Sequence, residues 1–377
     1  LRMTESLPLP SSGFVTLFIF GLLCTIGSGC SDTDRLFDRR SPLYTGVQFQ
    51  NAITEDDTLM NPVDYRYLYN GGGVGIGDFN NDGRPDLYFT GNMVENRLYL
   101  NQGNFQFREV TAEARVAAEG YWSTGVAVVD INQDGLLDLY VCVGGPPSAG
   151  TDRANRLYVN QGNGTFTDDI HSWVDHMSTS SMGADIADYN NDRRPDIFVL
   201  DMLAEGNRRQ KLLAISPTPL YRNSPQYTRN MLQFNNGNGT FSEIGQLAGV
   251  SNTDWSWAAL FADFDLNGLK DLYVTNGVPR DQTNLDFQYG RRAEVRGEQS
   301  RTPSDLYELA QKIPSTPIPN YIFRNEGNLT FEDVSTDWGL AKKGFSNGAA
   351  YADFDRDGDL DLVVNNVNER AWVYRNN

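Results

Sequence analysis

The stretch Asn347–Asn366, NGAAYADFDRDGDLDLVVNN, reads as a strand, a turn rich in carboxylates and a second strand. Carboxylates occupy positions 1, 3, 5 and 9 of the turn, and these are Asp353, Asp355, Asp357 and Asp361. Carboxylates this close repel one another unless a cation lies among them. Oxygen ligands at alternating positions suit calcium, with the backbone carbonyl of Asp359 at position 7 and Gly358 making the sharp turn at position 6. The stretch therefore predicts a calcium loop.

The loop differs from an EF-hand, although its first half has the same pattern. An EF-hand needs a bidentate glutamate at position 12 and a helix on each side. Position 12 here is Val364, within the apolar run LDLVV, and the residues before the loop are small. Both flanks therefore predict strands, so the metal site is expected between two strands of one sheet.

Four earlier stretches repeat this plan, and each is followed by an apolar run. Acidic turns without metal are the alternative, but they do not explain the carboxylate repeated at position 9. We predict about one calcium ion per repeat, held by positions 1, 3, 5 and 9 and by the carbonyl of position 7. The predicted ligands are Asp78, Asn80, Asp82, Arg84 and Asp86; Asp130, Asn132, Asp134, Leu136 and Asp138; Asp188, Asn190, Asp192, Arg194 and Asp196; Asp263, Asp265, Asn267, Leu269 and Asp271; and Asp353, Asp355, Asp357, Asp359 and Asp361.

The five loops are expected to bind calcium unequally. The last has the most aspartates and should bind most tightly. The third carries Arg193 where the others carry glycine, and a non-glycine residue at positive φ costs roughly 1 kcal/mol. We therefore expect the third site to be the weakest.

A second half of the repeat follows each of the first four loops, as in NRLYVNQGNGTFTDD (155–169). It reads as a strand, a turn rich in asparagine and glycine, and a strand that opens on phenylalanine, which is typical of a hairpin. One repeat is thus four strands, too few to bury its own faces. The fold class predicted for residues 46–377 is all-β, a β-propeller of four-stranded antiparallel blades. Five loops are visible, and a larger ring stays open as an alternative.

The last repeat lacks a fourth strand. Residues 46–54, GVQFQNAIT, alternate in polarity and suit that strand, so we expect them to pair with residues 371–374 and close the ring. Two insertions are also expected, at about 203–229 and 280–319. The second predicts a helix that Thr302 caps and Pro314 ends. Such insertions lie on a rim of a propeller, where binding usually occurs.

The first 29 residues hold the apolar run GFVTLFIFGLLCTI, which is short for a membrane span and typical of a secretory signal. The run ends at Cys30 in a sequence that resembles a lipoprotein signal, although Gly27 stands where an aliphatic residue is usual. We expect lipidation of Cys30, a polar linker over 30–45 and a location on the outer membrane of a bacterium, at the cell surface. A plain secretory signal is the alternative.

The net charge of −18 excludes nucleic acid as an expected partner, and much of it belongs to the calcium loops. No nucleophile with a base, zinc spacing or phosphate loop is present, so no catalytic residue is predicted. His171 and His176 read as loop or packing residues. Trp255 and Trp257 could stack on sugars, but packing between blades is the favoured interpretation.

Three phrases resemble the FG-GAP or VCBS repeat family, whose propellers also occur in integrin α-subunits. They are residues 70–92, residues 241–265 and residues 346–366. Bacterial lipoproteins related to cartilage acidic protein are more similar still. In them an ASPIC/UnbV domain typically follows the propeller, and no such domain is recognised in this chain, which suggests a fragment. Family propellers commonly have seven blades, against five loops here. The resemblance implies calcium-binding extracellular scaffolding, often beside glycan-uptake systems.

The favoured function is a non-enzymatic surface module that binds glycan or protein at the propeller rim. Its contact with the membrane would be through the lipid anchor only. Two alternatives remain open from the sequence. The chain could be a glycan lyase or hydrolase component, or it could be a structural or adhesion subunit of an outer-membrane complex. The identity of the ligand cannot be derived from these residues.

Overall fold

The computed structural model describes residues 40–55, 68, 71–145, 153–212, 226–281, 283–295 and 311–377. The chain divides into Leu1–Ser41 and Pro42–Asn377, and every strand described here belongs to the second unit. In the described ranges, none of the helices is long and apolar enough to cross a membrane. The predicted signal peptide and Cys30 lie outside the described residues.

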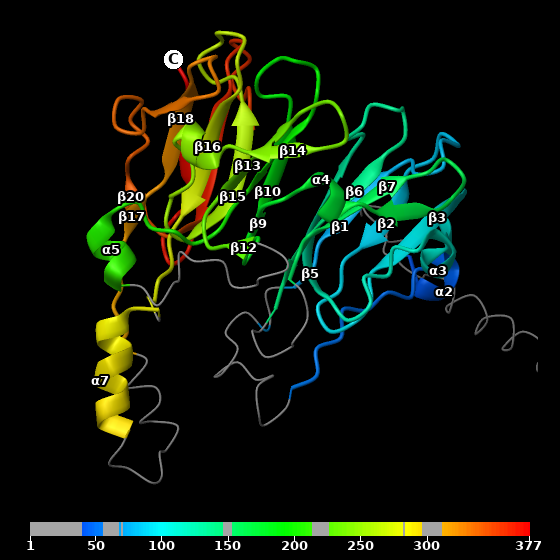
Figure 1. Cartoon of the computed structure of the whole chain (residues 1–377), viewed down its shortest axis with the longest axis horizontal. Coiled ribbons are helices and arrows are strands. Elements are labelled where there is room, and N and C mark those ends of the chain that lie inside the picture. The colour runs from blue at the N-terminus through cyan, green and yellow to red at the C-terminus, as the bar shows by residue number, and fades with distance from the viewer. Residues whose placement is uncertain are drawn as a thin grey trace, which may run out of the picture. The chain divides into compact units, whose positions relative to one another are not determined.

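Four sheets have four antiparallel strands each, and a fifth has three (Figure 1). Blade 1 is β1 (Val74–Gly77), β2 (Asp86–Phe89), β3 (Arg97–Gly103) and β4 (Gln106–Glu109); blade 2 is β5 (Trp122–Val129), β6 (Asp138–Gly144), β7 (Arg156–Asn160) and β8 (Phe166–Asp168). Blade 3 is β10 (Ala184–Ala187), β11 (Asp196–Val199), β13 (Met231–Asn235) and β14 (Phe241–Glu243); blade 4 is β15 (Ser256–Ala262), β16 (Asp271–Asn276), β18 (Tyr321–Asn325) and β19 (Phe331–Asp333). Blade 5 is β21 (Ser346–Ala352), β22 (Asp361–Asn366) and β23 (Trp372–Tyr374).

Each blade is a simple meander in chain order, which is the topology that the repeated hairpins predict. The predicted metal loop joins the first strand to the second in every blade. The aspartate at position 9 is the first residue of the second strand, so Gly77 pairs with Asp86 in blade 1 and Ala352 pairs with Asp361 in blade 5.

The first strands of successive blades lie side by side: β1 against β5, β5 against β10, β10 against β15 and β15 against β21. The hydrophobic clusters lie between neighbouring blades. Tyr189 and Phe198 of blade 3, for example, pack with Phe261 of blade 4. Because each small sheet buries its faces against the next sheet, the described fold is a β-propeller, as the sequence predicts.

An asparagine at the end of the third strand, or just beyond it in blade 5, joins each of blades 2 to 5 to the blade before it. In blades 2 to 5, its Nδ2 donates a hydrogen bond to the carbonyl of loop position 2 in the preceding blade. The pairs are Asn160 to Phe79 (2.9 Å), Asn235 to Ile131 (3.3 Å), Asn325 to Tyr189 (2.8 Å) and Asn376 to Phe264 (2.6 Å). The same hydrogen bond therefore recurs at each of these blade interfaces.

The two end blades each leave a face exposed. Phe354 of blade 5 is 57% exposed, whereas the residues at the same loop position in blades 1 to 4 are at most 8% exposed. Val373 is 68% exposed, although Leu157 and its other equivalents in the third strand are buried. On blade 1, Ile76 is 61% exposed. These are the positions that face a neighbouring blade elsewhere in the fold.

The expectation that residues 46–54 complete the last blade is wrong, because the structure places them against blade 1. Phe49 stacks on Phe89, with ring centroids 5.0 Å apart. Asn51 Nδ2 donates to Asn92 Oδ1 at 2.7 Å, and the Asn92 backbone N–H donates to Asn51 Oδ1 at 3.0 Å. In the described residues, β23 pairs only with β22. The amide pair and the aromatic stack therefore decide the place of this segment, which sequence alternation alone does not.

Both insertions begin in the connection between a second and a third strand, so their described residues start from the rim opposite the metal loops. The predicted helix of the second insertion falls mostly on residues outside the described ranges. The structure shows instead an earlier helix, α7 (Leu285–Val295), which the sequence analysis missed. The remaining elements are α2 (Pro42–Thr45), α3 (Thr111–Ala114), α4 (Ile170–Trp173), α5 (Asn207–Leu212), α6 (Gly245–Ala248), β9 (Met177–Ser178), β12 (Gln226–Tyr227), β17 (Ile318–Pro319) and β20 (Lys343–Gly344).

Candidate metal loops and the insertion rim

The aspartate at position 1 organises each loop by accepting backbone hydrogen bonds. Asp78 accepts the N–H of Asp82 on Oδ1 (3.0 Å) and the N–H of Gly83 on Oδ2 (2.7 Å). The same two bonds recur in the other four loops, at Asp130, Asp188, Asp263 and Asp353. The turn is therefore preorganised by its own backbone, which holds the position 1 carboxylate at the centre of the loop.

Position 6 has a positive φ in all five loops. Gly83 has a φ of 83° and Gly358 a φ of 102°. Arg193, the exception in the sequence, takes a φ of 69°, and its N–H donates to Asp188 Oδ2 at 2.8 Å. The third loop thus keeps the common turn in spite of the arginine. Arg193 adopts a left-handed backbone conformation there, which costs free energy in any residue other than glycine.

The aspartate at position 9 is buried and joins the loop to the third strand. Asp138 accepts the Ile131 N–H at 2.9 Å and the Asn160 N–H at 2.7 Å. Burial raises the pKa of Asp138 and of Asp271 to about 6, and that of Asp196 to about 7. The sequence predicts this residue as a metal ligand, and the structure shows that it also holds the blade together.

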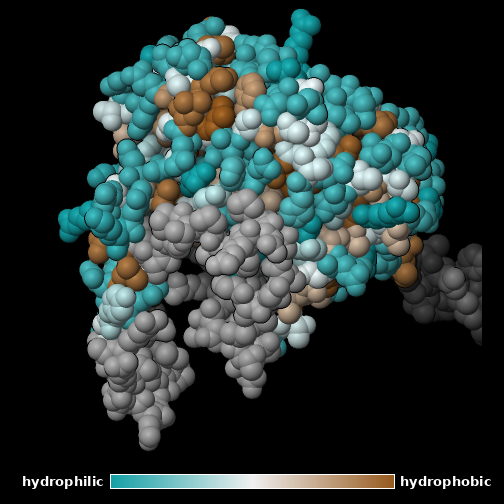
Figure 2. All heavy atoms as spheres, viewed as in Figure 1, coloured by the Kyte–Doolittle hydropathy of each residue, from teal (hydrophilic) through white to brown (hydrophobic). Residues whose placement is uncertain are grey.

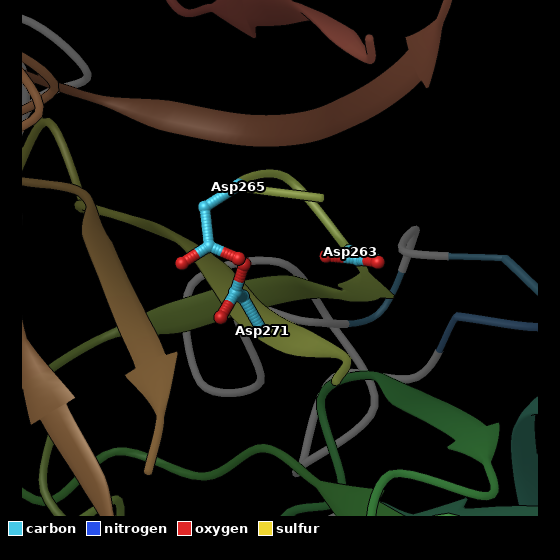
Figure 3. Close-up of side chains that lie close together, drawn as sticks. All are labelled: Asp263, Asp265 and Asp271. Carbon is cyan, nitrogen blue, oxygen red and sulfur yellow. The ribbon is translucent and has the colours of Figure 1, made fainter. Parts of the chain in front are cut away.

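Three carboxylates approach one another within 4.8 Å in the fourth and fifth loops. The sets are Asp263, Asp265 and Asp271, shown in Figure 3, and Asp353, Asp355 and Asp361. The first three loops carry asparagine at position 3 instead. There the amide donates to position 5, as Asn80 does to Asp82 at 3.1 Å. The fourth loop has no more aspartates at these positions than the first three, but its three carboxylates lie closer together.

Arginine side chains compensate part of the negative charge in three loops. Arg84 contacts Asp82 at 2.5 Å, and Arg194 contacts Asp192 at 2.6 Å. Arg375 contacts Asp355 at 2.7 Å and Asp357 at 3.1 Å. The second and fourth loops have no such arginine contact among the described residues. A cation in the first, third or fifth loop would have to share these carboxylates with the guanidinium.

The donor set of each loop fits calcium. The side chains at positions 1, 3, 5 and 9 supply carboxylate or amide oxygen, and no nitrogen or sulfur ligand is among them. Hard oxygen donors in an exposed, acidic turn are what calcium prefers. The predicted position 7 ligands, in Arg84, Leu136, Arg194, Leu269 and Asp359, act through backbone carbonyls, so their side chains need not be alike.

The insertion rim is held together by an ion-pair cluster that sequence reasoning missed. Arg209 of α5 donates to both Asp254 and Asp281, with the Asp281 contact at 3.0 Å. Both aspartates are almost completely buried. Glu205 accepts a hydrogen bond from Tyr321 at 3.1 Å. Arg209, Asp254 and Asp281 are far apart in the sequence, so no local sequence pattern predicts that they meet. Only the folded structure brings them together.

The other candidate residues pack as the sequence analysis favoured. Trp255 is buried, and Trp257 donates its Nε1–H to the Gly277 carbonyl at 2.7 Å. The ring centroids of His176 and Tyr227 lie 5.4 Å apart. His171 lies exposed in α4. The two histidines thus lie in different surroundings.

Known proteins match this chain over most of its length. It is 23% identical to cartilage acidic protein 1 of Mus musculus over 351 residues, which cover 89% of this chain and 45% of that protein. The Homo sapiens protein of the same name is also 23% identical, with 44% of its length covered. The chain thus spans a little under half the length of the curated relatives it matches.

One solved structure is of an Agrocybe aegerita lectin, and its title describes recognition of non-reducing terminal N-acetylglucosamine. The match covers 80% of each chain at 15% identity with a TM-score of 0.31, which is too distant to bear on this chain's ligand. The FG-GAP-like repeat matches residues 78–141, 147–199, 220–274 and 314–364, which together make up more than half of the chain. The chain therefore belongs to the FG-GAP-like repeat family.

Proposed function

We propose that this chain is a calcium-stabilised, non-enzymatic binding module that takes a glycan or protein ligand at the insertion rim. Two insertions from neighbouring blades begin on the same rim there. Arg209 of the first insertion contacts the buried Asp281 at the start of the second, and also the buried Asp254 in the connection before blade 4. This cluster is the observation that carries the proposal. Loops that only connect strands do not need a buried charge cluster to hold them, whereas binding loops gain affinity from being held in one arrangement.

Calcium would be held by the position 1, 3, 5 and 9 side chains and the position 7 carbonyls. It would neutralise the acidic turns and rigidify the rim opposite the insertions. The loop residues also stabilise the blade directly. The position 1 aspartates fix the turn, and the position 9 aspartates join the turn to the third strand. The metal is thus proposed as structural, and recognition is assigned to the other rim.

We also propose that Cys30 is lipidated and that the anchor holds the module at the surface of a bacterial outer membrane. The support is the sequence alone, in which an apolar run precedes Cys30 and acidic residues follow it. The Cys30→Ser variant should leave the membrane fraction when cells are fractionated. Retention of that variant in the membrane at wild-type levels would show that the anchor lies elsewhere.

A glycan array probed with the calcium-loaded chain tests the binding function. We expect saturable binding that weakens when Arg208 and Lys211, both exposed on α5, are changed to glutamate. The matched control is Arg115→Glu, which makes the same kind of change on blade 1. Equal losses from both variants, or no binding to glycan or to candidate surface proteins, would overturn the assignment. Release of sugar from a bound glycan would favour the enzymatic alternative.

A further inference from the structure

A cavity of about 150 Å³ lies between blades 2 and 3. Residues from the middle of β5 line one side of it, and residues 181–184, which lead into β10, line the other. The start of β10 is the end of that strand away from its metal loop, so the cavity lies toward the insertion rim. No residue of a metal loop is among the described residues that line it.

Glycines explain why space is left between these two blades. At this level the neighbouring pairs of blades are in close contact. A Cβ added to Gly73 of blade 1 would lie 3.1 Å from the Gly125 Cα of blade 2, and one added to Gly183 of blade 3 would collide with the Trp257 carbonyl oxygen of blade 4. A Cβ added to Gly125, by contrast, would meet no atom within 4 Å. Gly125 lines the cavity, so the missing side chain there leaves it open.

A cysteine makes the same place less polar than in two other blades. Thr90 of blade 1 and Thr275 of blade 4 come four residues after the position 9 aspartate, and their hydroxyls accept N–H groups of the first strand at 2.6 and 2.9 Å. The equivalent residue of blade 2 is Cys142, which lines the cavity. Burial raises the pKa of the Cys142 thiol to about 12, so the thiol is neutral. Ala127 and Ala184, which also line the cavity, pack against the hydrophobic cluster that includes Cys142.

One polar group of the lining is left unsatisfied. Ser181 lines the cavity, is 1% exposed, and its hydroxyl has no hydrogen-bond partner in the described parts of the chain. A buried hydroxyl without a partner costs free energy, which a ligand atom could recover. None of the described residues that line the cavity is charged. The group that enters should therefore be neutral, because a charge would lose its hydration without gaining a partner.

Size and polarity together define the ligand group. An apolar cavity of roughly 150 Å³ holds benzene, so about six heavy atoms fit. An acetyl group is smaller than this, and it offers a methyl group to the apolar lining and a carbonyl oxygen to the Ser181 hydroxyl. The methyl group of a deoxysugar has no acceptor, and a carboxylate or sulfate is charged. Most of the molecular face in Figure 2 is hydrophilic, so a methyl group gains more from the cavity than from that surface.

We propose that this cavity binds the acetyl group of an acetylated glycan. The inference rests on the proposed glycan-binding function and names the substituent that the site selects. The methyl group lies against Ala127, Cys142 and Ala184, and the carbonyl oxygen accepts the hydrogen bond of the Ser181 hydroxyl. The acetyl group can come from an amide or from an ester, because both carry the same methyl and carbonyl groups.

Acetamide and acetate test the cavity directly, since they are alike in size and differ in charge. Each is titrated into the calcium-loaded chain and followed by NMR saturation transfer. Acetamide should bind saturably at one site. Acetate should bind more weakly by roughly tenfold or more, because its charge finds no partner in the lining. Equal binding of the two, or no saturable binding of acetamide, would overturn the proposal.

Two glycine variants locate the site. Gly125→Leu should fill the cavity and abolish acetamide binding, and it brings no backbone strain because Gly125 does not have a positive φ. Gly348→Leu is the matched control, at the equivalent position of blade 5, where an added Cβ also meets no atom within 4 Å. It should leave binding unchanged. Loss of binding in both variants, or in neither, would place acetamide elsewhere and contradict the assignment.

Two serine variants test the hydrogen bond, and they decide the matter if thermal melting shows that Gly125→Leu does not fold. Ser181→Ala should weaken acetamide binding by roughly tenfold. Ser123→Ala removes another buried hydroxyl that has no partner, but Ser123 does not line the cavity, so binding should be unchanged. Equal effects of the two changes would show that Ser181 is not the donor.

Glycan pairs that differ only in acetylation connect the cavity to the proposed function. On an array, the acetylated member of a pair should bind more tightly by roughly tenfold or more, and amide-linked and ester-linked pairs show which source the site accepts. Glycan binding that ignores acetylation would overturn the acetyl site and leave the proposed glycan function standing. Binding of acetamide without binding of any glycan would overturn the glycan as the carrier, together with the proposed glycan function.

Discussion

At the scale of single residues, asparagine side chains form hydrogen bonds that hold neighbouring blades together. Asn325 shows why: its Nδ2 reaches the Tyr189 carbonyl of the preceding blade at 2.8 Å and the Lys270 carbonyl of its own blade at 3.0 Å. Its Oδ1 accepts the Gly327 N–H at 2.9 Å. A carboxylate or an apolar residue cannot supply two donors and an acceptor at once.

Asn325→Ala should lower the free energy of unfolding by about 3 kcal/mol, because buried carbonyls lose their donor and a cavity forms. Asn101→Ala is the matched control, since the Asn101 amide reaches Pro85 within its own blade and is exposed. It should cost about 1 kcal/mol. Urea unfolding of both variants measures the difference, and equal losses would contradict the role in joining blades.

Asp201 should make stability depend on pH. It is fully buried and accepts hydrogen bonds from Ser178 Oγ at 2.6 Å and Thr179 N–H at 2.8 Å, and burial raises its pKa to about 6. Because the folded pKa is higher than the unfolded one, the folded state keeps a proton that the unfolded state releases between about pH 4 and 6. The stability due to this proton is lost as pH rises through that window.

Relative to Asp201→Asn, the wild type should therefore lose about 2 kcal/mol of unfolding free energy between pH 4.5 and pH 7. The comparison cancels the contributions of other titrating groups. Chemical unfolding of both proteins at several pH values gives the two curves. Parallel curves would show that Asp201 stays ionised throughout the range.

At the scale of elements, the two insertions depend on the blades for their arrangement. Helix α5 has only six residues, too few to be stable alone. Arg209 holds it to the connection before blade 4 through Asp254 and to the start of the second insertion through Asp281. One positive charge, shared between two buried aspartates, is thus the main contact that holds α5 in place.

Arg209→Met should destabilise the insertion rim by about 3 kcal/mol, since two buried carboxylates lose their cation. Arg208→Met is the control, because Arg208 is exposed on the same helix and its loss should change stability little. Hydrogen exchange at α5 and α7 reads out the local effect. If hydrogen-exchange protection at α5 and α7 were unchanged in Arg209→Met, the Arg209 cluster would not be what orders the rim.

At the scale of the whole molecule, repulsion within five acidic loops opposes folding, and cation binding would relieve it in every blade. Binding to the folded state alone stabilises it by about 2.7 kcal/mol per site at a hundredfold excess of ligand over Kd. Several sites add up to a large share of the stability of a domain of this size.

Chelation should lower the melting temperature by on the order of 10 °C, and added calcium should restore it. Asp353→Asn should reduce the calcium-dependent gain more than Asp188→Asn, since the fifth loop brings three carboxylates together and the third loop holds strain at Arg193. A melting curve unaffected by chelator would exclude the structural role. Equal effects of the two variants would exclude the ranking.

The sequence by itself determined the repeat, the strand–loop–strand unit and the propeller class. These follow from local periods: apolar alternation, the glycine or Arg193 at position 6, and the carboxylates at fixed spacing. The path of residues 46–54 was decided by tertiary contacts with Phe89 and Asn92. So was the Arg209 cluster, because it joins groups from separate parts of the chain whose meeting depends on how the blades pack.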